Sequence, residues 1–174
     1  MKKSVPATGA LLLAALLAGC ETSGPGPGLP PGASVTRFHL GQQIARAEIR
    51  VEPVNPAEAN SPHFAQVAGP VERELTRLGW TVARGNARSE QVAVVRVDQG
   101  SRAASGRGGQ GSVVTELGVR IQRRSDGHLA WEGRAQLEAR SGTALAEPGA
   151  AVDRLAEALF RDFPGESGRT IRVR

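Results

Sequence analysis

The amino-acid sequence predicts an α+β domain, in which one mostly antiparallel sheet carries two helices packed on one face. Apolar residues alternate with polar ones along several short segments, which is typical of half-buried strands. Along two longer segments the apolar residues recur at helical spacing instead, as on one side of an amphipathic helix. The expected order is strand, strand, helix, strand, hairpin, helix, strand, with no internal repeat.

Two of the strands expected ahead of the hairpin have clear patterns. In ARAEIRV, residues 45–51, every second residue is apolar, which predicts a strand with one buried face. In QVAVVRV, residues 91–97, the apolar run is nearly continuous, which predicts a central strand. A mobile, glycine-rich loop is expected after it, over residues 99–112.

The first helix is expected between these two strands. Ser61 is a suitable N-cap, Pro62 fits the first helical position, and Gly79 is a suitable C-terminal stop. Pro70 lies inside this pattern, where it lacks the backbone donor that a helix needs. The sequence therefore predicts either a kink at Pro70 or a short helix that ends before it.

The hairpin is the clearest local pattern. Apolar and polar residues alternate along residues 113–121 and again along residues 129–139. Ser125, Asp126 and Gly127 lie between them and are typical turn residues. We expect a β-hairpin with one buried face.

The chain is expected to end with a helix, a turn and a closing strand. Residues 150–163 place four large apolar side chains on one helical stripe, which Pro164 and Gly165 would then terminate. From Thr170 the chain alternates again, as a last strand should. The four residues of the stripe are Val152, Leu155, Leu159 and Phe163.

The N-terminus predicts an exported lipoprotein. Residues 1–19 combine two lysines with an apolar run too short to span a bilayer. The run ends in Gly19 and Cys20, a pattern similar to the bacterial lipobox, in which the thiol is acylated and the chain is cleaved in front of the cysteine. Cys20 is the only cysteine, so no disulfide can form within one molecule. The alternatives are an ordinary signal peptide or an uncleaved anchor.

The expected organisation is a signal peptide at residues 1–19, an acylated Cys20 with a Pro/Gly-rich tether at residues 20–34, and one periplasmic domain at residues 35–174. Diacylglycerol and a fatty acyl group on Cys20 would be the only covalent additions, with no other cofactor. Because Glu21 is not aspartate, the expected location is the periplasmic face of the outer membrane of a Gram-negative bacterium.

Charge and motifs exclude several classes of function. Removing Lys2 and Lys3 with the signal lowers the formal net charge from +5 to +3, an excess too small to indicate nucleic-acid binding. GRGGQG, residues 106–111, satisfies G-x-G-x-x-G, and Asp126 follows at about the usual distance. The next residues have a strand pattern, however, whereas a dinucleotide site needs a helix there.

No enzyme chemistry is expected. His39, His63 and His128 stand alone, without the histidine or acidic neighbours of a metal site on one element. No serine lies in a nucleophile motif, and the cysteine would be acylated. A hydrolase is therefore the weakest alternative.

An anion-binding surface is the main alternative function. Arg46 and Arg50 lie on one predicted strand, and Arg172 and Arg174 lie on another, at the end of the sequence. If these strands pair, the four guanidinium groups would form a stripe suited to phosphate or carboxylate groups. Such a stripe would bind anionic glycans or lipid headgroups.

Four segments resemble one known family. They are VTRFHL at residues 35–40, SPHFAQVAGPVERELTRLGW at 61–80, GHLAWEGRA at 127–135, and LFRDFPGESGRTIRV at 159–173. Together with the lipobox, they resemble the bacterial envelope lipoproteins of domain-of-unknown-function family 4136. The resemblance implies a membrane-tethered periplasmic α+β domain with no established activity and no catalytic residues. We expect a non-catalytic lipoprotein that binds an envelope partner or supports envelope maintenance.

Overall fold

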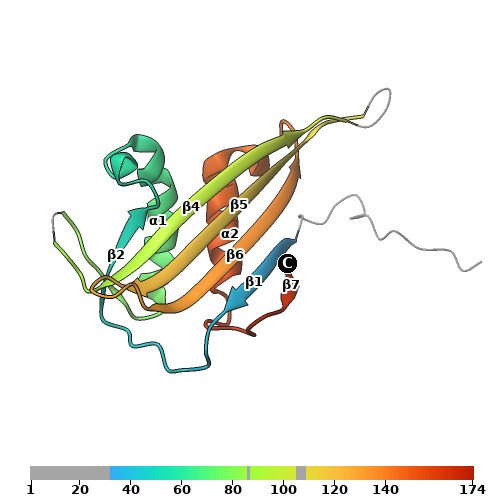
Figure 1. The fold of residues 1–174 in the computed structure, drawn as a ribbon. Helices are drawn as coiled ribbons and strands as arrows, with labels where there is room; N and C mark the ends of the chain where they lie inside the picture. Colours follow the sequence, from blue (N-terminus) through green and yellow to red (C-terminus); the bar gives the residue numbers. More distant parts are fainter. Residues whose placement is uncertain (1–31, 86, 105–108) are drawn as a thin grey trace, which may run out of the picture.

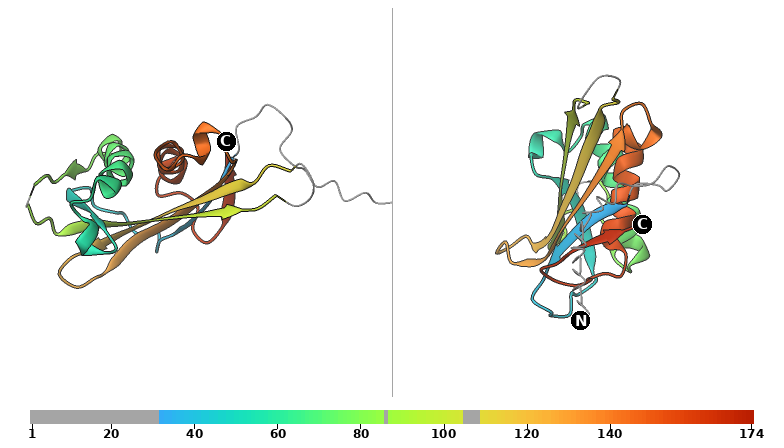
Figure 2. Two further views of the ribbon diagram at one scale, coloured as in Figure 1. Left: turned by 90° about the horizontal axis from the view of Figure 1, so that it is seen from above. Right: turned by 90° about the vertical axis from the view of Figure 1, so that its right-hand side faces the viewer.

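The computed structural model describes residues 32–85, 87–104 and 109–174, which form one seven-stranded sheet with two helices on one of its faces (Figures 1 and 2). No helix within these residues is long and apolar enough to cross a membrane. The elements are β1 (Ala33–Phe38), β2 (Glu48–Pro53), η1 (Pro56–Glu58), α1 (Pro62–Arg77), β3 (Thr81–Val82), β4 (Gln91–Arg102), β5 (Ser112–Arg123), β6 (Leu129–Arg140), η2 (Ala144–Ala146), α2 (Pro148–Phe160) and β7 (Thr170–Val173).

The strand order in the sheet is β3-β2-β4-β5-β6-β1-β7. The pairs of β2 with β3 and with β4 are parallel, and the other four pairs are antiparallel. The predicted α+β fold with a mostly antiparallel sheet is therefore confirmed. The core lies between the sheet and the two helices, because the inward side chains of the strands meet the apolar stripes of α1 and α2.

The first two strands differ from the prediction at their starts. β1 begins at Ala33, so the last two residues of the expected tether belong to the sheet. β2 begins at Glu48 and not at Ala45, because Ala45 and Ala47 are exposed and have little side chain to bury. Only the second half of the alternating segment 45–51 is therefore a strand.

Helix α1 runs through Pro70, so the expectation of a shorter helix is wrong. The N-cap prediction is confirmed, because Ser61 Oγ accepts a hydrogen bond from the backbone N–H of Phe64 at 3.0 Å. The carbonyl that Pro70 leaves without a helical donor belongs to Gln66, an exposed residue, so water can satisfy it. The ring of Pro70 is itself buried on the apolar side of the helix, which offsets the lost bond.

Strands β4, β5 and β6 are longer than predicted. β4 continues from Val97 to Arg102 and pairs with β5 up to the pair of Arg102 with Ser112. Residues 99–102 and 112 of the loop expected over residues 99–112 are thus strand, which leaves only the segment 103–111 between the strands, and residues 105–108 of it lie outside the described structure. The predicted hairpin of β5 and β6 is confirmed, with its turn at Ser125 to Gly127.

A glycine makes room for the largest side chain of the core. A Cβ added at Gly133 would lie 2.3 Å from Cη2 of Trp131 and 2.7 Å from Cδ1 of Leu159. The indole therefore lies over a gap in β6, where it stacks on Phe160 with ring centroids 5.4 Å apart. This cluster joins the sheet to the last turn of α2.

Helix α2 ends at Phe160, so the prediction that Phe163 belongs to it is wrong. The helix stops there because a side chain from β1 binds its last carbonyl groups. The buried guanidinium of Arg37 donates to the carbonyl oxygens of Leu159, Ala158 and Arg161, each at 2.9 Å. Phe163 follows in the turn after the helix and still packs in the core.

The tail then closes the sheet beside β1. Gly165 has a φ of 77°, as expected of the residue that turns the chain, and a Cβ there would lie 2.6 Å from Cδ of Arg37. β7 follows and pairs antiparallel with β1, with Ile171 and Val173 toward the core. The predicted closing strand is confirmed.

Candidate partner-binding cleft

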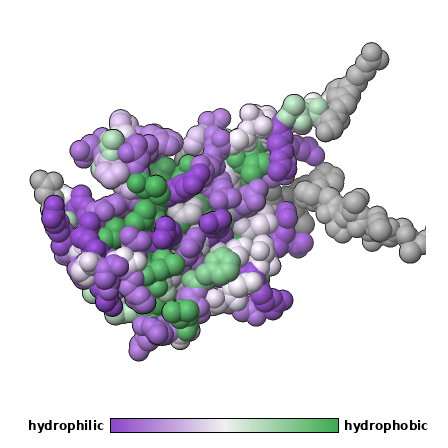
Figure 3. Space-filling model, viewed as in Figure 1, coloured by the Kyte–Doolittle hydropathy of each residue, from purple (hydrophilic) through white to green (hydrophobic). Residues whose placement is uncertain are grey.

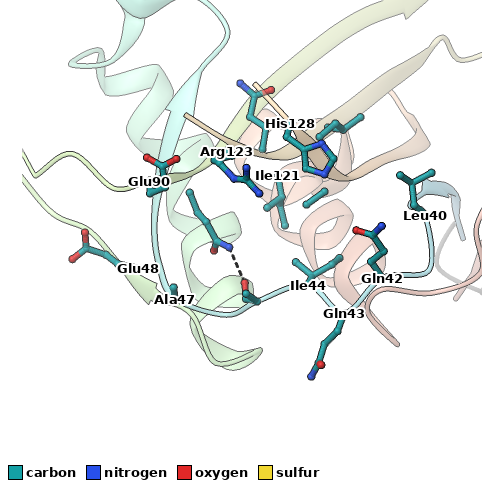
Figure 4. Close-up of a pocket in the computed structure, with 15 residues that line it drawn as sticks. Leu40, Gln42, Gln43, Ile44, Ala47, Glu48, Glu90, Ile121, Arg123 and His128 are labelled. Atoms are coloured by element: carbon teal, nitrogen blue, oxygen red, sulfur yellow. Dashed lines mark hydrogen bonds between the residues drawn. The ribbon is translucent and has the colours of Figure 1, made fainter. Parts of the chain in front are cut away.

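A cleft of about 470 Å³ lies at one end of the sheet. In the sheet β1 and β2 are separated by β6, β5 and β4, so the segment 39–47 must cross the ends of three strands to connect them. The cleft lies between this crossing segment and those strand ends, as Figure 4 shows. Its lining residues are Leu40, Gln42, Gln43, Ile44, Ala45, Ala47, Glu48, Glu90, Gln91, Ile121, Gln122, Arg123, His128, Leu129 and Ala130.

The crossing segment is held in place by one amide and one apolar side chain. The Gln91 side chain donates to the carbonyl oxygen of Ala45 at 2.8 Å, the dashed line in Figure 4, and it accepts from Nε1 of Trp80 at 2.9 Å. Ile44 packs against the main core from the middle of the segment. The crossing segment, which forms the outer wall of the cleft, is therefore fixed both by a hydrogen bond and by apolar packing. The cleft is thus preformed.

The inner surface of the cleft is apolar. Ile44 and Ile121 face each other across it, and Leu129 adds to the same surface (Figure 4). Leu40 lies at the mouth with 76% of its surface exposed, the highest fraction among the exposed large apolar residues. On the face of the molecule away from the helices, such apolar residues form separate patches within a largely hydrophilic surface (Figure 3). Leu40 thus extends the apolar surface of the cleft to its mouth.

The charged groups around the cleft are engaged with their own neighbours. Glu48 accepts from the buried Ser89 hydroxyl at 2.8 Å, and Glu90 is hydrogen bonded to Ser125. Arg123 pairs with Asp126 at 2.8 Å. The rim therefore offers mainly the neutral side-chain amides of glutamines, which match the hydrogen-bonding groups of a peptide backbone and do not favour an anion.

The hairpin turn beside the cleft is stabilised by Asp126. Its carboxylate accepts a hydrogen bond from the backbone N–H of His128 at 2.9 Å, which lowers the pKa of Asp126 below its ordinary value, and the Arg123 guanidinium acts in the same direction. The turn carries His128, whose ring lies at the edge of the cleft (Figure 4). Asp126 thus has a structural role.

The predicted arginine stripe does not form. Arg50 is on β2 and Arg172 on β7, and four strands separate these two in the sheet. Arg50 is used locally, because it donates to the carbonyl oxygen of Ala87 at 3.0 Å and pairs with Glu52 at 3.3 Å. Arg46 lies over the ring of Trp80, 5.8 Å from its centroid. Arg174, the last residue, stays on the β7 side of the sheet, so the stripe prediction is wrong.

The histidines do not come together in the fold, and the predicted lipidation residues are not part of the described structure. His39 belongs to the tail, because its Nε2 is hydrogen bonded to the carbonyl oxygen of Gly165 at 2.9 Å. His63 and His128 are exposed and far from one another in the fold, and no group of three potential metal ligands occurs within the described ranges. Gly19 and Cys20 lie outside the described residues.

The sequence did not indicate the cleft. Its walls come from the β1–β2 connection and from one end of β4, β5 and β6, which meet only in the folded chain. The available signal was the segment HLGQQIA, residues 39–45, which places Leu40 and Ile44 among uncharged polar residues without a strand or helix period.

Comparison with known proteins shows a partial relative. No protein-family model matches the chain. Over 62 residues it is 50% identical to an uncharacterized protein of Zymomonas mobilis, a match that covers 36% of this chain and 23% of that protein. The chain thus matches less than a quarter of the length of this relative.

Three solved structures are similar to this chain at low sequence identity. A PDZ domain protein from Parabacteroides distasonis is similar with a TM-score of 0.53 and 12% identity, over 82% of this chain and 39% of that one. A PelC dodecamer from Paraburkholderia phytofirmans has a TM-score of 0.44 and 13% identity, over 72% and 94% of the two chains. A minor lipoprotein from Acinetobacter baumannii has a TM-score of 0.41 and 15% identity, over 68% and 91%. The first likeness supports the α+β fold alone, and TM-scores under 0.5 do not show a shared fold.

Proposed function

We propose that this chain is a lipid-anchored envelope lipoprotein whose domain binds an extended segment of another envelope protein in the cleft, without catalysis. The anchor would be Cys20, acylated after cleavage behind Gly19, on the periplasmic face of the outer membrane. The single cysteine directly after a short apolar run supports this, because a lipobox accounts for both features together. A family resemblance at the tail points the same way.

The length of the tether supports a domain that works near the membrane. The sheet begins at Ala33, so residues 21–32 separate it from the acylated cysteine. Fully extended, a chain of this length spans at most about 40 Å. The domain would therefore meet partners that lie in or beside the same membrane.

The cleft supports a peptide as the ligand, and this observation carries the proposal. An apolar side chain of the partner would fit between Ile44 and Ile121, where apolar surface is already preformed. The amides of Gln42 and Gln43 at the rim would satisfy the peptide groups on either side of it. Leu40 would be covered by the bound segment.

The anchor is tested by metabolic labelling. Replacing Cys20 with serine is expected to abolish palmitate incorporation, because the hydroxyl does not replace the thiol that accepts the lipid. The variant should also leave the membrane fraction. Ser23→Ala, a change in the tether, serves as the matched control and should keep full labelling. Equal labelling of the wild type and Cys20→Ser would disprove the anchor.

The cleft is tested by Leu40→Asp. Because Leu40 is 76% exposed, we expect its replacement to change the free energy of unfolding by less than about 0.5 kcal/mol. With a photo-cross-linking amino acid at Gln42, the full chain in its native envelope should form an adduct with one partner protein. The Leu40→Asp change should remove that adduct, since a charge at the mouth opposes burial of the partner.

Val54→Asp is the matched control for this experiment. Val54 is also apolar and 59% exposed, but it lies away from the cleft. The adduct should persist in this variant. An adduct that survives Leu40→Asp, or that disappears equally in both variants, would contradict the cleft as the binding site.

A further inference from the structure

Strand β4 has an exposed edge along its second half. β2 pairs with β4 only from Gln91 to Val95, although β4 runs on to Arg102. Within the described residues no strand lies beside the edge beyond that point, and residues 98–102 are all exposed. Figure 1 shows β4 continuing past the end of β2 toward the tip of the β4–β5 ribbon. Such an edge is a ready template for another strand.

The direction of the free backbone groups follows from the last bond to β2. The carbonyl of Val95 accepts a hydrogen bond from the backbone N–H of Val54 at 3.2 Å, so the peptide groups of Val95 point away from β5. In an antiparallel ladder this direction alternates along the strand. The backbone groups of Val97, Gln99 and Ser101 therefore point outward, and those of the residues between them bind β5.

We propose that this edge pairs antiparallel with the same edge of a second copy, with Gly100 on the two-fold axis. Gln99 of each copy then lies opposite Ser101 of the other. The outward N–H of each of these two residues donates to the outward carbonyl oxygen of the other. Gly100 lies opposite Gly100 in the closer, non-hydrogen-bonded kind of pair, where Cα atoms are about 4.5 Å apart. A Cβ at Gly100 would meet nothing within 4 Å in one copy, so there is room on the face of the sheet for a side chain at this position.

The charges along the edge select this register. With Gly100 on the axis, Asp98 of each copy lies opposite Arg102 of the other, so two attractive pairs form, in exchange for the exposed pairs of Asp98 with Arg96 and of Arg102 with Glu138 within one copy. A shift by one residue would place the outward backbone groups of one copy opposite residues of the other copy whose backbone groups bind β5. The next permitted register in one direction puts Arg96 opposite Arg102, and in the other it leaves Asp98 opposite the uncharged Ala104. The edge is thus complementary to itself, which favours a second copy over an unrelated strand.

Cysteine cross-linking tests the register. Gly100→Cys is expected to give a disulfide-linked dimer when the full chain is oxidised in its native membrane, because Cα atoms about 4.5 Å apart fall within disulfide range. Arg96→Cys is the matched control on the same face of β4. The two cysteines would lie about 27 Å apart along the ladder, so this variant should stay monomeric. The wild type, with Cys20 alone, gives the background.

Two further changes test the forces that hold the pair, each in the Gly100→Cys background. Ser101→Pro removes an outward N–H without breaking the ladder to β5, and it should abolish the cross-link. Asp98→Arg should reduce the cross-linked fraction about tenfold, because it places like charges opposite each other at two symmetric positions. Adding Arg102→Asp to Asp98→Arg should restore the cross-link, since the opposite charges then face each other again.

The outcomes are distinct. A cross-linked dimer for Gly100→Cys but not for Arg96→Cys, with rescue by the double charge exchange, supports the proposal. A monomer in every variant overturns it, and so does an adduct whose mass shows a different protein at this edge. Circular dichroism of each variant separates these outcomes from unfolding, because a folded variant without a cross-link counts against the pairing.

Discussion

Replacing Trp131 with alanine is expected to lower the free energy of unfolding by about 3 to 5 kcal/mol, the range for removing a large aromatic side chain from a packed core. The indole is fully buried, stacks on Phe160 and lies 5.1 Å from the ring of Phe163. Its Nε1–H also donates to the carbonyl oxygen of Pro164 at 3.0 Å. The change would therefore loosen β6, the end of α2 and the tail together.

Urea unfolding followed by far-ultraviolet circular dichroism measures this effect. Trp131→Phe is the graded control, because it keeps an aromatic ring in the same place and loses only part of the volume and the hydrogen bond to Pro164. We expect the free energy of unfolding of Trp131→Phe to lie between that of the wild type and that of Trp131→Ala. A loss below about 1 kcal/mol for Trp131→Ala would show that this cluster does not stabilise the fold as argued.

The second large effect is expected for Arg37→Met, with a loss of about 2 to 4 kcal/mol, because buried carbonyl groups then lack a donor. The Arg37 side chain is 2% exposed overall, and burial lowers the pKa of its guanidinium while Asp162 opposes the shift. Its three bonds reach the carbonyl oxygens of Ala158, Leu159 and Arg161. The positive charge also faces the negative end of the α2 dipole.

Two control variants separate the roles of shape, charge and position. Arg37→Lys keeps the charge, but one ammonium group cannot reproduce the planar fork, so most of the loss should remain. Arg134→Met removes an exposed arginine from the neighbouring strand β6, where it pairs with Glu132, and should change stability by less than about 0.5 kcal/mol. Equal losses for Arg37→Met and Arg134→Met, measured by urea unfolding, would exclude the capping role.

The local parts of the fold could be predicted because their causes are local. The β5–β6 hairpin follows from alternating residues and a turn, and the start of α1 follows from a serine cap. The end of α2 could not be predicted, because its cause is Arg37, which is remote in sequence. The helical spacing alone predicted that Phe163 belongs to the helix, which is wrong. The prediction that its side chain packs on the apolar side is correct.

The candidate sites depended on the order of the strands, which no short pattern contains. The arginine stripe required β2 and β7 to be neighbours, and the sheet places them far apart. The cleft arises from the same strand order. Because three strands lie between β1 and β2, the segment that connects them must cross the strand ends, and this segment forms one wall of the cleft. Both the failure of the stripe and the presence of the cleft therefore have one cause.

The position of β1 also constrains when the domain can form during synthesis. β1 is the first strand to leave the ribosome, but its two neighbours in the sheet begin at Leu129 and Thr170. Contacts this distant in sequence make folding slow, since a long loop must close before they form. β1 must therefore stay unpaired until β6 has been made, and a chain that stops before β7 leaves the other edge of β1 bare.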